Sequence, residues 1–376
     1  MNVKNISEFY IFGAGKLGQL WYDCWKEFYK ILGFIDNDIS KQDNGYLGLN
    51  VYSIDKIPTS NAIVVALGNK FSKSVITQLV AVGYQVNINL FTITDVSATI
   101  PDKRYIEYSY KHVFDEFPNL NNPKSFNEKL NWLKLNYRTP LFTTLSDKIA
   151  SRKYVSNLIG EEYVIPILDI WSFPDEIDYD ILPNKFVLQC NHDSGSFIIC
   201  TDKLKFDKNN AKNRLIKCLQ EDFSLRSREW GYKNVERKVF ASKYIGDIDV
   251  DYRLFVFNGE VKLVECHIYA KKYHHEGVRL TNLYLPNWTF LNVQHGYNYD
   301  ESYHIDKPSN FEEMIKIAKI LAGNIPFIRV DFWYHNNKII FNEFALYPNA
   351  GFGVIKPKEW DFTLGEWLKL PEKIVL

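Results

Sequence analysis

Strand-length apolar runs alternate with helix-length amphipathic segments through the first hundred residues of the chain. The apolar runs include FYIF at 9–12, ILGFIDND at 31–38 and AIVVALG at 62–68, and QLWYDCWKEFY at 19–29 lies between the first two. Two parallel strands need a crossover connection, usually a helix, so this order is typical of βαβ units. It predicts a small parallel sheet and restricts the topologies open to this half of the chain.

Three glycines follow the first apolar run in the spacing GxGxxG: Gly13, Gly15 and Gly18. In a βαβ unit the first allows the tight turn, the second lets the backbone approach a phosphate, and the third packs the helix against the sheet. The second run leads into Asp36, and an acid at the end of that strand contacts a ribose hydroxyl in such units. We therefore expect a Rossmann-like α/β domain over residues 1–95 that binds a nucleotide. The alternative is that the glycines only shape the turn.

Two segments of this first domain, GFIDND and GLNVYSIDKIP, resemble the N-terminal domain of bacterial sugar acyltransferases, in which both have close counterparts. The resemblance covers about residues 8–95 and implies a nucleotide-sugar ligand as much as NAD. It also leaves open an alternative function for the whole chain, an NAD-dependent sugar-nucleotide oxidoreductase that works through this domain.

Charge and composition exclude several classes of partner. Lys plus Arg and Asp plus Glu both number 45, so the formal charge is zero and no basic excess marks a nucleic-acid binder. The five cysteines form no CxxC pair, and no apolar run approaches the length of a membrane-spanning helix. We expect a cytoplasmic protein without a nucleic-acid partner or a transmembrane segment, and the oligomeric state stays open.

The residue pattern of the sequence changes after the first domain. Residues 96–125 carry three prolines and show no clean periodicity, which indicates a linker. Beyond them the pattern becomes helical, with Leu130 and Leu133 one turn apart. A second domain is therefore expected over residues 126–376.

Four segments of this second domain carry a further resemblance. They are LSDKIASRKYVSNLIGEEYVIPILDIW, FVLQCNHDSGSFIICTDK, VFASKYIGDIDVDYRLFVFNGEVKLVE and FIRVDFWYHNNKIIFNEFALYPNAGFG. Their order and spacing resemble the TupA-like branch of the ATP-grasp superfamily, which is named for teichuronopeptide biosynthesis. The resemblance spans about residues 120–370 and implies an α+β ATP-grasp domain that uses ATP and Mg²⁺. Such enzymes phosphorylate a carboxylate and let an amine attack the acyl phosphate, which forms an amide.

The resemblance implies a phosphate-side motif in SDKIASRK, which Asp147, Lys148 and Arg152 match. Lys148 is the expected contact for the α- and β-phosphates, because a lysine acts as a compact point charge. The alternative is an ordinary helix start at which Asp147 caps the helix and Lys148 is solvated.

Arg253 is the expected contact for the γ-phosphate or the acyl phosphate, because a guanidinium fork matches phosphate geometry. It lies two residues after Asp251, so both side chains leave the same face of a strand. The alternative is a surface ion pair of Arg253 with Asp251 or Glu265.

The segment HDSGS stands between two strands and suits a loop that covers phosphates. Three of its residues offer backbone N–H and hydroxyl donors: Ser194, Gly195 and Ser196. His192 is expected to act on a phosphate or on the acyl intermediate. Relatives carry Lys where this chain has Gln189, a cofactor-contacting position, and Gly where it has Asp193. Either another cation compensates for these differences or nucleotide binding is weakened.

The resemblance places the interdomain hinge at the end of VFASKYIGD. Backbone groups of Lys243, Tyr244 and Ile245 are expected to contact the adenine edge of ATP. Relatives show Glu where this chain has Ser242, so the acid that binds the ribose is left to Asp247 or Asp249.

Asp331 and Glu343 match the two magnesium-binding acids of the family. Both lie in the apolar segment RVDFWYHNNKIIFNEF, where an unpaired carboxylate is costly to bury and needs a cation. That cation is either Mg²⁺ or Arg329, which would make an Arg329–Asp331–Glu343 network without metal. Relatives often carry a polar ligand where Ala345 stands, so Asn342 or Asn349 and water would complete the coordination.

The two acids share a metal only in one strand register. Residues opposite one another in an antiparallel pair share a face, so Asp331 must pair with Glu343. A three-residue turn NNK achieves this pairing, whereas a two-residue turn NN places Asp331 opposite Asn342 unless a bulge restores the register.

These expectations combine into an ATP-dependent carboxylate–amine ligase. The family implies a uronic acid or glutamyl group of a bacterial surface polysaccharide as the carboxylate, and an amino acid or another amine as the nucleophile. The basic segment KKYHHEGVR, which includes His275 and Arg279, is expected to bind an acidic substrate. The main alternative is a catalytically degenerate ATP-grasp protein that only binds nucleotide or sugar or acts as a scaffold.

Overall fold

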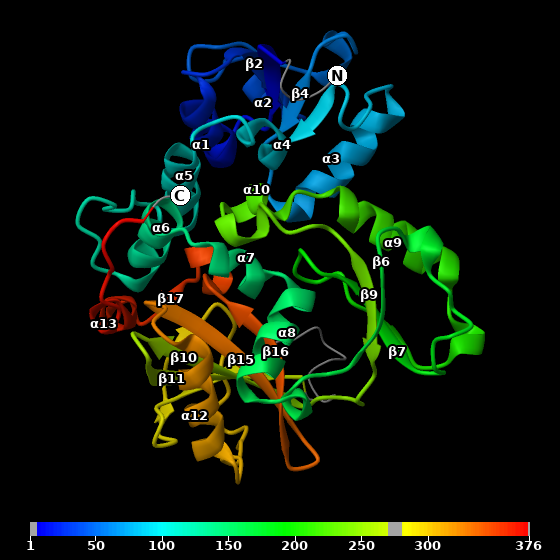
Figure 1. Ribbon diagram of the computed structural model, residues 1–376. Coiled ribbons are helices and arrows are strands. Elements are labelled where there is room, and N and C mark those ends of the chain that lie inside the picture. Colours follow the sequence, from blue (N-terminus) through cyan, green and yellow to red (C-terminus); the bar gives the residue numbers. More distant parts are fainter. Residues whose placement is uncertain (1–5, 270–279, 375–376) are drawn as a thin grey trace. The chain divides into compact units, whose positions relative to one another are not determined.

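Figure 1 shows a computed structural model of the chain, which describes residues 6–269 and 280–374. The chain divides into two compact units, Met1–Pro118 and Asn119–Leu376. The basic segment at 270–279, with His274, His275 and Arg279, lies outside the described residues.

The larger unit contains, in its described part, a six-stranded antiparallel sheet in the order β13-β12-β11-β10-β15-β16 and a four-stranded sheet in the order β6-β9-β7-β8. Strands β14 and β17 form a third, two-stranded sheet. The strands are β6 Ile167–Trp171, β7 Phe186–Cys190, β8 Ile198–Cys200, β9 Val239–Lys243, β10 Val250–Phe257, β11 Glu260–Ile268, β12 Leu280–Tyr284, β13 Phe290–Leu291, β14 Gln294–His295, β15 Phe327–His335, β16 Lys338–Ala345 and β17 Ile355–Lys356. The helices are α6 Phe126–Asn136, α7 Pro140–Ser146, α8 Lys148–Ile159, α9 Lys208–Gln220, α10 Phe223–Ser227, α12 Phe311–Ala322 and α13 Glu359–Trp367, with 3₁₀ turns η3 Glu161–Tyr163, η4 Pro174–Glu176, η5 Lys203–Lys205, η6 Trp230–Tyr232 and η7 Pro348–Gly351.

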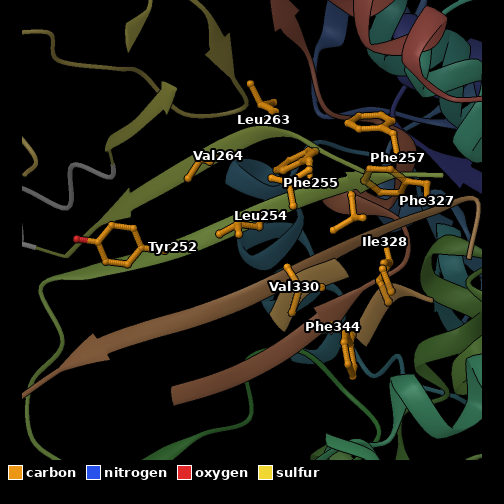
Figure 2. Close-up of a cluster of buried hydrophobic side chains, with 14 of the residues drawn as sticks. Tyr252, Leu254, Phe255, Phe257, Leu263, Val264, Phe327, Ile328, Val330 and Phe344 are labelled. Carbon is orange, nitrogen blue, oxygen red and sulfur yellow. The ribbon is translucent and has the colours of Figure 1, made fainter. Parts of the chain in front are cut away.

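The six-stranded sheet is covered unevenly on its two faces. Leu254 and Val330 belong to its large apolar core, and helix α12 packs against β10, β11 and β15 (Figures 1 and 2). The alternate residues Phe255 and Phe327 pack against Phe126 of helix α6, with ring centroids 6.4 and 4.9 Å away. Charged side chains take over this second face farther along β10 and β15.

The four-stranded sheet packs one face against helix α9, and its other face is also covered at β9, where Phe240 and Ser242 are buried. Leu188, Cys190 and Ala241 pack against helix α9 through Leu215. The alternate residues of β7 and β9, which include Gln189 and Phe240, point to the other face and pair with one another across the strands.

The smaller unit is built on a five-stranded parallel sheet in the order β3-β2-β1-β4-β5, and the predicted parallel sheet is thus confirmed. Its strands are β1 Glu8–Phe12, β2 Lys30–Ile35, β3 Val51–Tyr52, β4 Ile63–Val65 and β5 Leu90–Thr92, and its helices are α1 Lys16–Trp25, α2 Ile39–Gln42, α3 Asn69–Ala81, α4 Ile93–Ser97 and α5 Asp102–Phe114, with the 3₁₀ turn η2 Ile54–Lys56. Phe9 and Ile11 belong to one apolar core with Trp25, and Phe12 belongs to a second core with Leu79, so strand β1 is buried on both faces.

The segment 96–125, expected as a linker, contains helix α5. Its Tyr105 and Tyr108, one turn apart, are buried, and the Tyr105 ring lies 5.7 Å from that of Trp21 in α1. The periodicity was hidden because the buried face of this helix is built from tyrosines, which combine a polar end with a large apolar ring.

The three glycines of the GxGxxG turn meet different surroundings. Gly13 has φ +120°, a value that favours glycine, and a Cβ on it would lie 2.9 Å from the Ala66 carbonyl oxygen. A Cβ on Gly18 would lie 1.8 Å from the Gly13 carbonyl oxygen, whereas a Cβ on Gly15 would meet nothing within 4 Å. Packing therefore explains Gly13 and Gly18 but not Gly15.

We predict that Gly18→Ala destabilises the smaller unit by more than about 2 kcal/mol, because the methyl group would force the α1–β1 turn apart. Gly15→Ala is the matched control and should change stability by less than about 1 kcal/mol. Thermal and urea unfolding of the full chain measure both. Equal stability of the two variants would show that the α1–β1 contact does not limit the fold.

Candidate functional site

A two-residue turn joins strands β15 and β16, and a bulge interrupts their pairing. Asn336 and Asn337 both have positive φ, +51° and +59°, as a type I′ turn requires. Near the turn the register follows the two-residue turn, but between Asp331 and Phe332 it shifts, so that Asp331 pairs with Glu343. Asn342 is the extra residue of the bulge. The bulge, rather than a three-residue turn, thus brings the two acids opposite one another.

Asp331 is fully buried and is held by Arg329. The Nε and Nη2 atoms of Arg329 donate to the two carboxylate oxygens of Asp331 at 2.7 and 2.6 Å, and Arg329 Nη2 lies 4.0 Å from Glu343 Oε1. Burial raises the pKa of Asp331 to about 7, although Arg329 opposes the shift. The network expected as the alternative to a metal site is therefore present, and Glu343 is its most exposed member, with 37% of its side chain accessible.

Arg253 is held by carboxylates on both sides. Its Nε donates to Asp251 Oδ2 at 2.9 Å, its Nη1 donates to Glu265 Oε1 at 3.1 Å, and its Nε lies 3.7 Å from Asp331 Oδ2. The carboxylates of these pairs are buried and Arg253 is largely so, so they are not the surface pairs expected as the alternative. Although burial lowers it, these carboxylates hold the pKa of Arg253 well above its usual range. The guanidinium is fixed in position before any ligand binds.

Glu265 is fixed in turn by His295 of β14. His295 Nδ1 donates to Glu265 Oε2 at 2.6 Å, and Asn349 Nδ2 lies 3.1 Å from His295 Nε2. Burial opposes the ionised form of Glu265, but His295 and Arg253 hold its pKa well below the usual range. Sequence reasoning missed His295, because its partner is 30 residues away and no local pattern marks the pair.

Asn349 lies in a loop that helix α6 holds in a left-handed conformation. Asn349 and Ala350 have φ +49° and +55°. Three buried side chains of α6, spaced along one helix face, donate to carbonyl oxygens of this loop: Asn127 to Gly353 at 2.9 Å, Asn131 to Gly351 at 2.7 Å and Lys134 to Ala350 at 2.5 Å. These bonds stabilise a left-handed backbone conformation that alanine rarely adopts.

The cluster carries more negative than positive groups. The guanidiniums of Arg253 and Arg329 are surrounded by four carboxylates, those of Asp251, Glu265, Asp331 and Glu343. The buried Oδ1 atom of Asp251 has no hydrogen-bond partner within the described chain. Such a surplus fits a cation.

Magnesium is the cation that the resemblance implies. It usually takes one or two carboxylates and completes its coordination with water and phosphate oxygens. Residues 6–269 and 280–374 contain no group of three His, Cys, Asp or Glu side chains arranged around a metal position. Glu343, whose side chain is partly exposed, is open to a Mg²⁺ ion that arrives with a phosphate, whereas both oxygens of Asp331 accept from Arg329 and would have to be shared with the metal. A metal enclosed by protein does not fit.

Lys148 anchors the HDSGS loop. Asp147 caps α8, as the alternative expected, by accepting from the Ile149 N–H at 2.8 Å, but Lys148 is not solvated. Its Nζ donates to the Asp193 carbonyl oxygen and to Cys190 O at 3.3 Å, and lies 3.4 Å from Asp193 Oδ1. The charge of Asp193 is thereby paired with Lys148.

The other loop residues divide into buried and exposed ones. Ser196 is buried and donates to Asp193 Oδ1 at 2.6 Å, whereas Ser194 and Gly195 form the exposed tip. His192 is buried against α9, with Nε2 3.1 Å from Cys218 O, and burial lowers its pKa. The structure thus brings Lys148, Asp193 and Ser196 together and separates His192 from the loop tip.

The hinge residues continue from β9. The Lys243 N–H donates to Pro166 O at 3.1 Å, and Tyr244 donates from its hydroxyl to Asp247 Oδ1 at 2.6 Å, while Ile245 is half-buried. Asp247, one of the two acids considered for the ribose, is therefore paired with Tyr244.

Arg152 lies one turn after Lys148 on α8. Its side chain is buried, with 8% of the residue accessible, and its guanidinium carbon lies 4.9 Å from the centroid of the Phe240 ring. Burial lowers the pKa of Arg152 to about 10, and its Nη1 has no hydrogen-bond partner among the residues that the structure describes. The arginine thus covers Phe240 on the face of the four-stranded sheet opposite α9.

In the smaller unit, Asp36 closes the glycine turn. Its Oδ2 accepts from the Ala14 N–H and from Lys41 Nζ, both at 2.9 Å, and its Oδ1 accepts from the Asp38 N–H at 3.0 Å. Asp36 thus stabilises the turn between β1 and α1, beside the open space at Gly15.

The comparison with protein families identifies the larger unit. The family described as TupA-like ATP-grasp matches residues 128–369, and the chain belongs to this family. No curated protein matches the chain. None of the described helices is long and apolar enough to cross a membrane.

Solved structures show weak likenesses over most of the chain. D-alanine–D-alanine ligase from Bacillus anthracis is 13% identical, with 91% of this chain and 86% of that chain covered and a TM-score of 0.30. A RimK domain ATP-grasp protein from Sphaerobacter thermophilus is 9% identical, with 96% and 99% covered and a TM-score of 0.32. L-amino acid ligase from Bacillus licheniformis is 10% identical, with 90% and 68% covered and a TM-score of 0.35. At these TM-scores the likenesses carry no functional argument.

We predict that Glu265→Gln lowers the free energy of unfolding at pH 7 by about 3–5 kcal/mol, because it removes the buried negative charge with which Arg253 Nη1 and His295 Nδ1 are paired. The depressed pKa means that ionised Glu265 contributes stability above the ordinary glutamate value of 4.5 and loses it as the pH falls toward the folded-state pKa. The difference from wild type should therefore narrow between pH 5 and pH 3. Urea unfolding across this range measures it, and a difference that grows toward low pH would contradict the assigned ionisation.

Proposed function

We propose that the protein is an ATP-dependent ligase that joins a carboxylate to an amine. The observation that carries the proposal is the placement of Arg253 and Arg329, each held by buried carboxylates, beside the facing pair Asp331 and Glu343. Fixed guanidiniums suit a phosphoryl transfer, because such transfer depends mainly on positioning and charge stabilisation. Membership of the TupA-like ATP-grasp family supports the same reaction class.

In the proposed reaction a carboxylate oxygen attacks the γ-phosphorus of ATP, and ADP leaves. The amine nitrogen then attacks the acyl carbon of the resulting acyl phosphate, phosphate leaves, and the amine proton passes to solvent or to a nearby carboxylate. Arg253 and Arg329 would orient the transferred phosphoryl group, and Lys148 would hold the HDSGS loop over the other phosphates. Asp331 and Glu343 would hold Mg²⁺, which would supply positive charge to the phosphate groups.

The substrates proposed here come from the family resemblance. A uronic acid or glutamyl group of a bacterial surface polysaccharide would be the carboxylate, and an amino acid or another amine would be the nucleophile, with the reaction taking place in the cytoplasm. The degenerate alternative drew on Gln189, Asp193, Ser242 and Ala345. The pairing of Asp193 with Lys148 weakens that alternative, because the added negative charge does not stand unpaired near the phosphate site.

We predict that Glu343→Gln lowers ligase turnover at least about 100-fold while leaving the thermal unfolding temperature close to that of wild type, because the carboxylate is only partly buried and the change removes a metal ligand. Phosphate release from Mg·ATP over a panel of uronic acids and amino acids measures turnover. Glu301→Gln, an exposed acid, is the matched control. Wild-type turnover in Glu343→Gln would refute the metal assignment.

A second proposal concerns the smaller unit, where the open space at Gly15 lies beside the start of α1. We propose that a phosphate of a nucleotide or nucleotide-sugar approaches the backbone at Gly15. The helix start would supply the positive end of its dipole, and Gly13 and Gly18 would keep the turn in shape.

We predict that UDP, a UDP-sugar or NAD raises the unfolding temperature of the smaller unit in wild type and not in Gly15→Ala, because the added methyl group takes the space of the phosphate. Differential scanning calorimetry of the full chain measures this. The variant must keep the ligand-free unfolding temperature of wild type, so that lost binding is separated from lost folding. An unchanged response in Gly15→Ala would contradict the phosphate position.

A further inference from the structure

Two cysteine side chains contact one another at the base of the HDSGS loop. Cys190 ends strand β7, and Cys218 lies in the last turn of helix α9, which packs on that strand. Cys190 Sγ lies 3.9 Å from Leu215 O, one helical turn before Cys218, and the two thiol groups hydrogen-bond to each other. Thiols in contact can form a disulfide without a large movement of the backbone.

The two thiols differ in exposure and in acidity. Cys190 is buried, whereas Cys218 is partly accessible. The hydrogen bond from Cys190 lowers the pKa of Cys218, while burial and the carboxylates of Asp193 and Glu221 oppose this shift. The thiolate is the nucleophilic form of cysteine, and an oxidant reaches accessible thiols first. Cys218 is therefore the thiol that meets an oxidant, and Cys190 is placed to react with the product.

The same two cysteines hold the HDSGS loop. The Cys190 N–H donates to Ser196 Oγ at 2.9 Å, and Cys190 O accepts from Lys148 Nζ at 3.3 Å. The thiol of Cys218 also hydrogen-bonds to the side chain of Asp193. A disulfide holds two sulfur atoms closer than a thiol hydrogen bond does, and it removes the hydrogen that Asp193 would accept. Oxidation of the pair would thus change the contacts that anchor the loop.

We propose that Cys190 and Cys218 form a dithiol site that hydrogen peroxide converts to a disulfide, and that this bond loosens the HDSGS loop. The bond can form without any nucleotide, so the inference does not depend on the proposed function.

The oxidation has two steps. First, the Cys218 thiolate attacks one oxygen of hydrogen peroxide, so that an S–O bond forms, the O–O bond breaks, and hydroxide leaves and takes up the thiol proton as water. Second, the sulfur of Cys190 attacks the sulfenic sulfur of Cys218, so that the S–S bond forms, the S–O bond breaks, and a second water leaves with the Cys190 proton. The two thiols together lose two electrons and two protons, and one peroxide becomes two waters.

The test compares the full chain before and after treatment with hydrogen peroxide. Wild type should lose two of its five thiols when these are titrated in denaturant, together with the mass of two hydrogen atoms. A digest without reductant should contain the Cys190 peptide linked to the Cys218 peptide. Amide hydrogen exchange of residues 191–196 should become at least about threefold faster, and dithiothreitol should restore the original rate.

Cys218→Ser is the variant for this test, because its hydroxyl keeps a donor for Asp193 but cannot form a disulfide. We expect its loop amides to exchange as in untreated wild type, both before and after peroxide. Cys200→Ser is the matched control, since it removes another thiol of the same apolar core. It should form the disulfide as wild type does.

The outcomes test the bond and its effect separately. Wild type that keeps all its thiols, or a Cys218 that oxidises to a sulfinic acid without a link to Cys190, would overturn the dithiol site. A disulfide that leaves loop exchange unchanged, or loop exchange that quickens equally in peroxide-treated Cys218→Ser, would overturn the effect on the loop. Neither result bears on the ligase proposal, which depends on turnover of Mg·ATP.

Discussion

The buried ion-pair cluster on the six-stranded sheet is the constraint on which the rest of the larger unit depends. Removing a charge from water is expensive, and a buried pair is tolerated only when nearly every donor and acceptor is used. The cluster meets this condition through five separate segments: β10 supplies Arg253, β11 supplies Glu265, β14 supplies His295, β15 supplies Arg329 and Asp331, and β16 supplies Glu343. The register of these strands and the charges in the site therefore specify one another.

Helix α6 supports the cluster from the side. Phe126 of this helix packs against Phe327 of the sheet, while its buried polar side chains hold the left-handed loop that carries Asn349. Asn349 meets His295, His295 holds Glu265, and Glu265 holds Arg253. The orientation of one arginine is thus set by hydrogen bonds that begin about a hundred residues away in the sequence. Such support keeps a charged group from reorganising when its ligand arrives, which is the physical basis of preorganisation.

Local sequence patterns correctly predicted several features of the fold. The alternation of apolar runs predicted the parallel sheet. The requirement that Asp331 pair with Glu343 predicted either a three-residue turn or a bulge, and the structure has the bulge. Local patterns did not predict the features that depend on distant contacts. Helix α5 was not predicted because tyrosines make up most of its buried face. His295 was missed because its carboxylate partner lies in another strand. The anchoring of the HDSGS loop was missed because Lys148 and Asp193 are distant in the sequence and meet only in the folded chain. The metal role of Asp331 and Glu343 and the phosphate contacts stay predictions.

The bulge at Asn342 separates the hairpin into two parts whose pairing registers differ by one residue. Toward the turn, side chains follow the two-residue connection, and toward the site they follow the pairing of Asp331 with Glu343. A chain with a three-residue turn and no bulge would present the same acids to the same place. The turn of this hairpin can therefore gain one residue if the bulge is lost at the same time. A sequence alignment that places both forms in the same columns without a gap would then misplace the acid of the second strand by one position, although the site itself is unchanged.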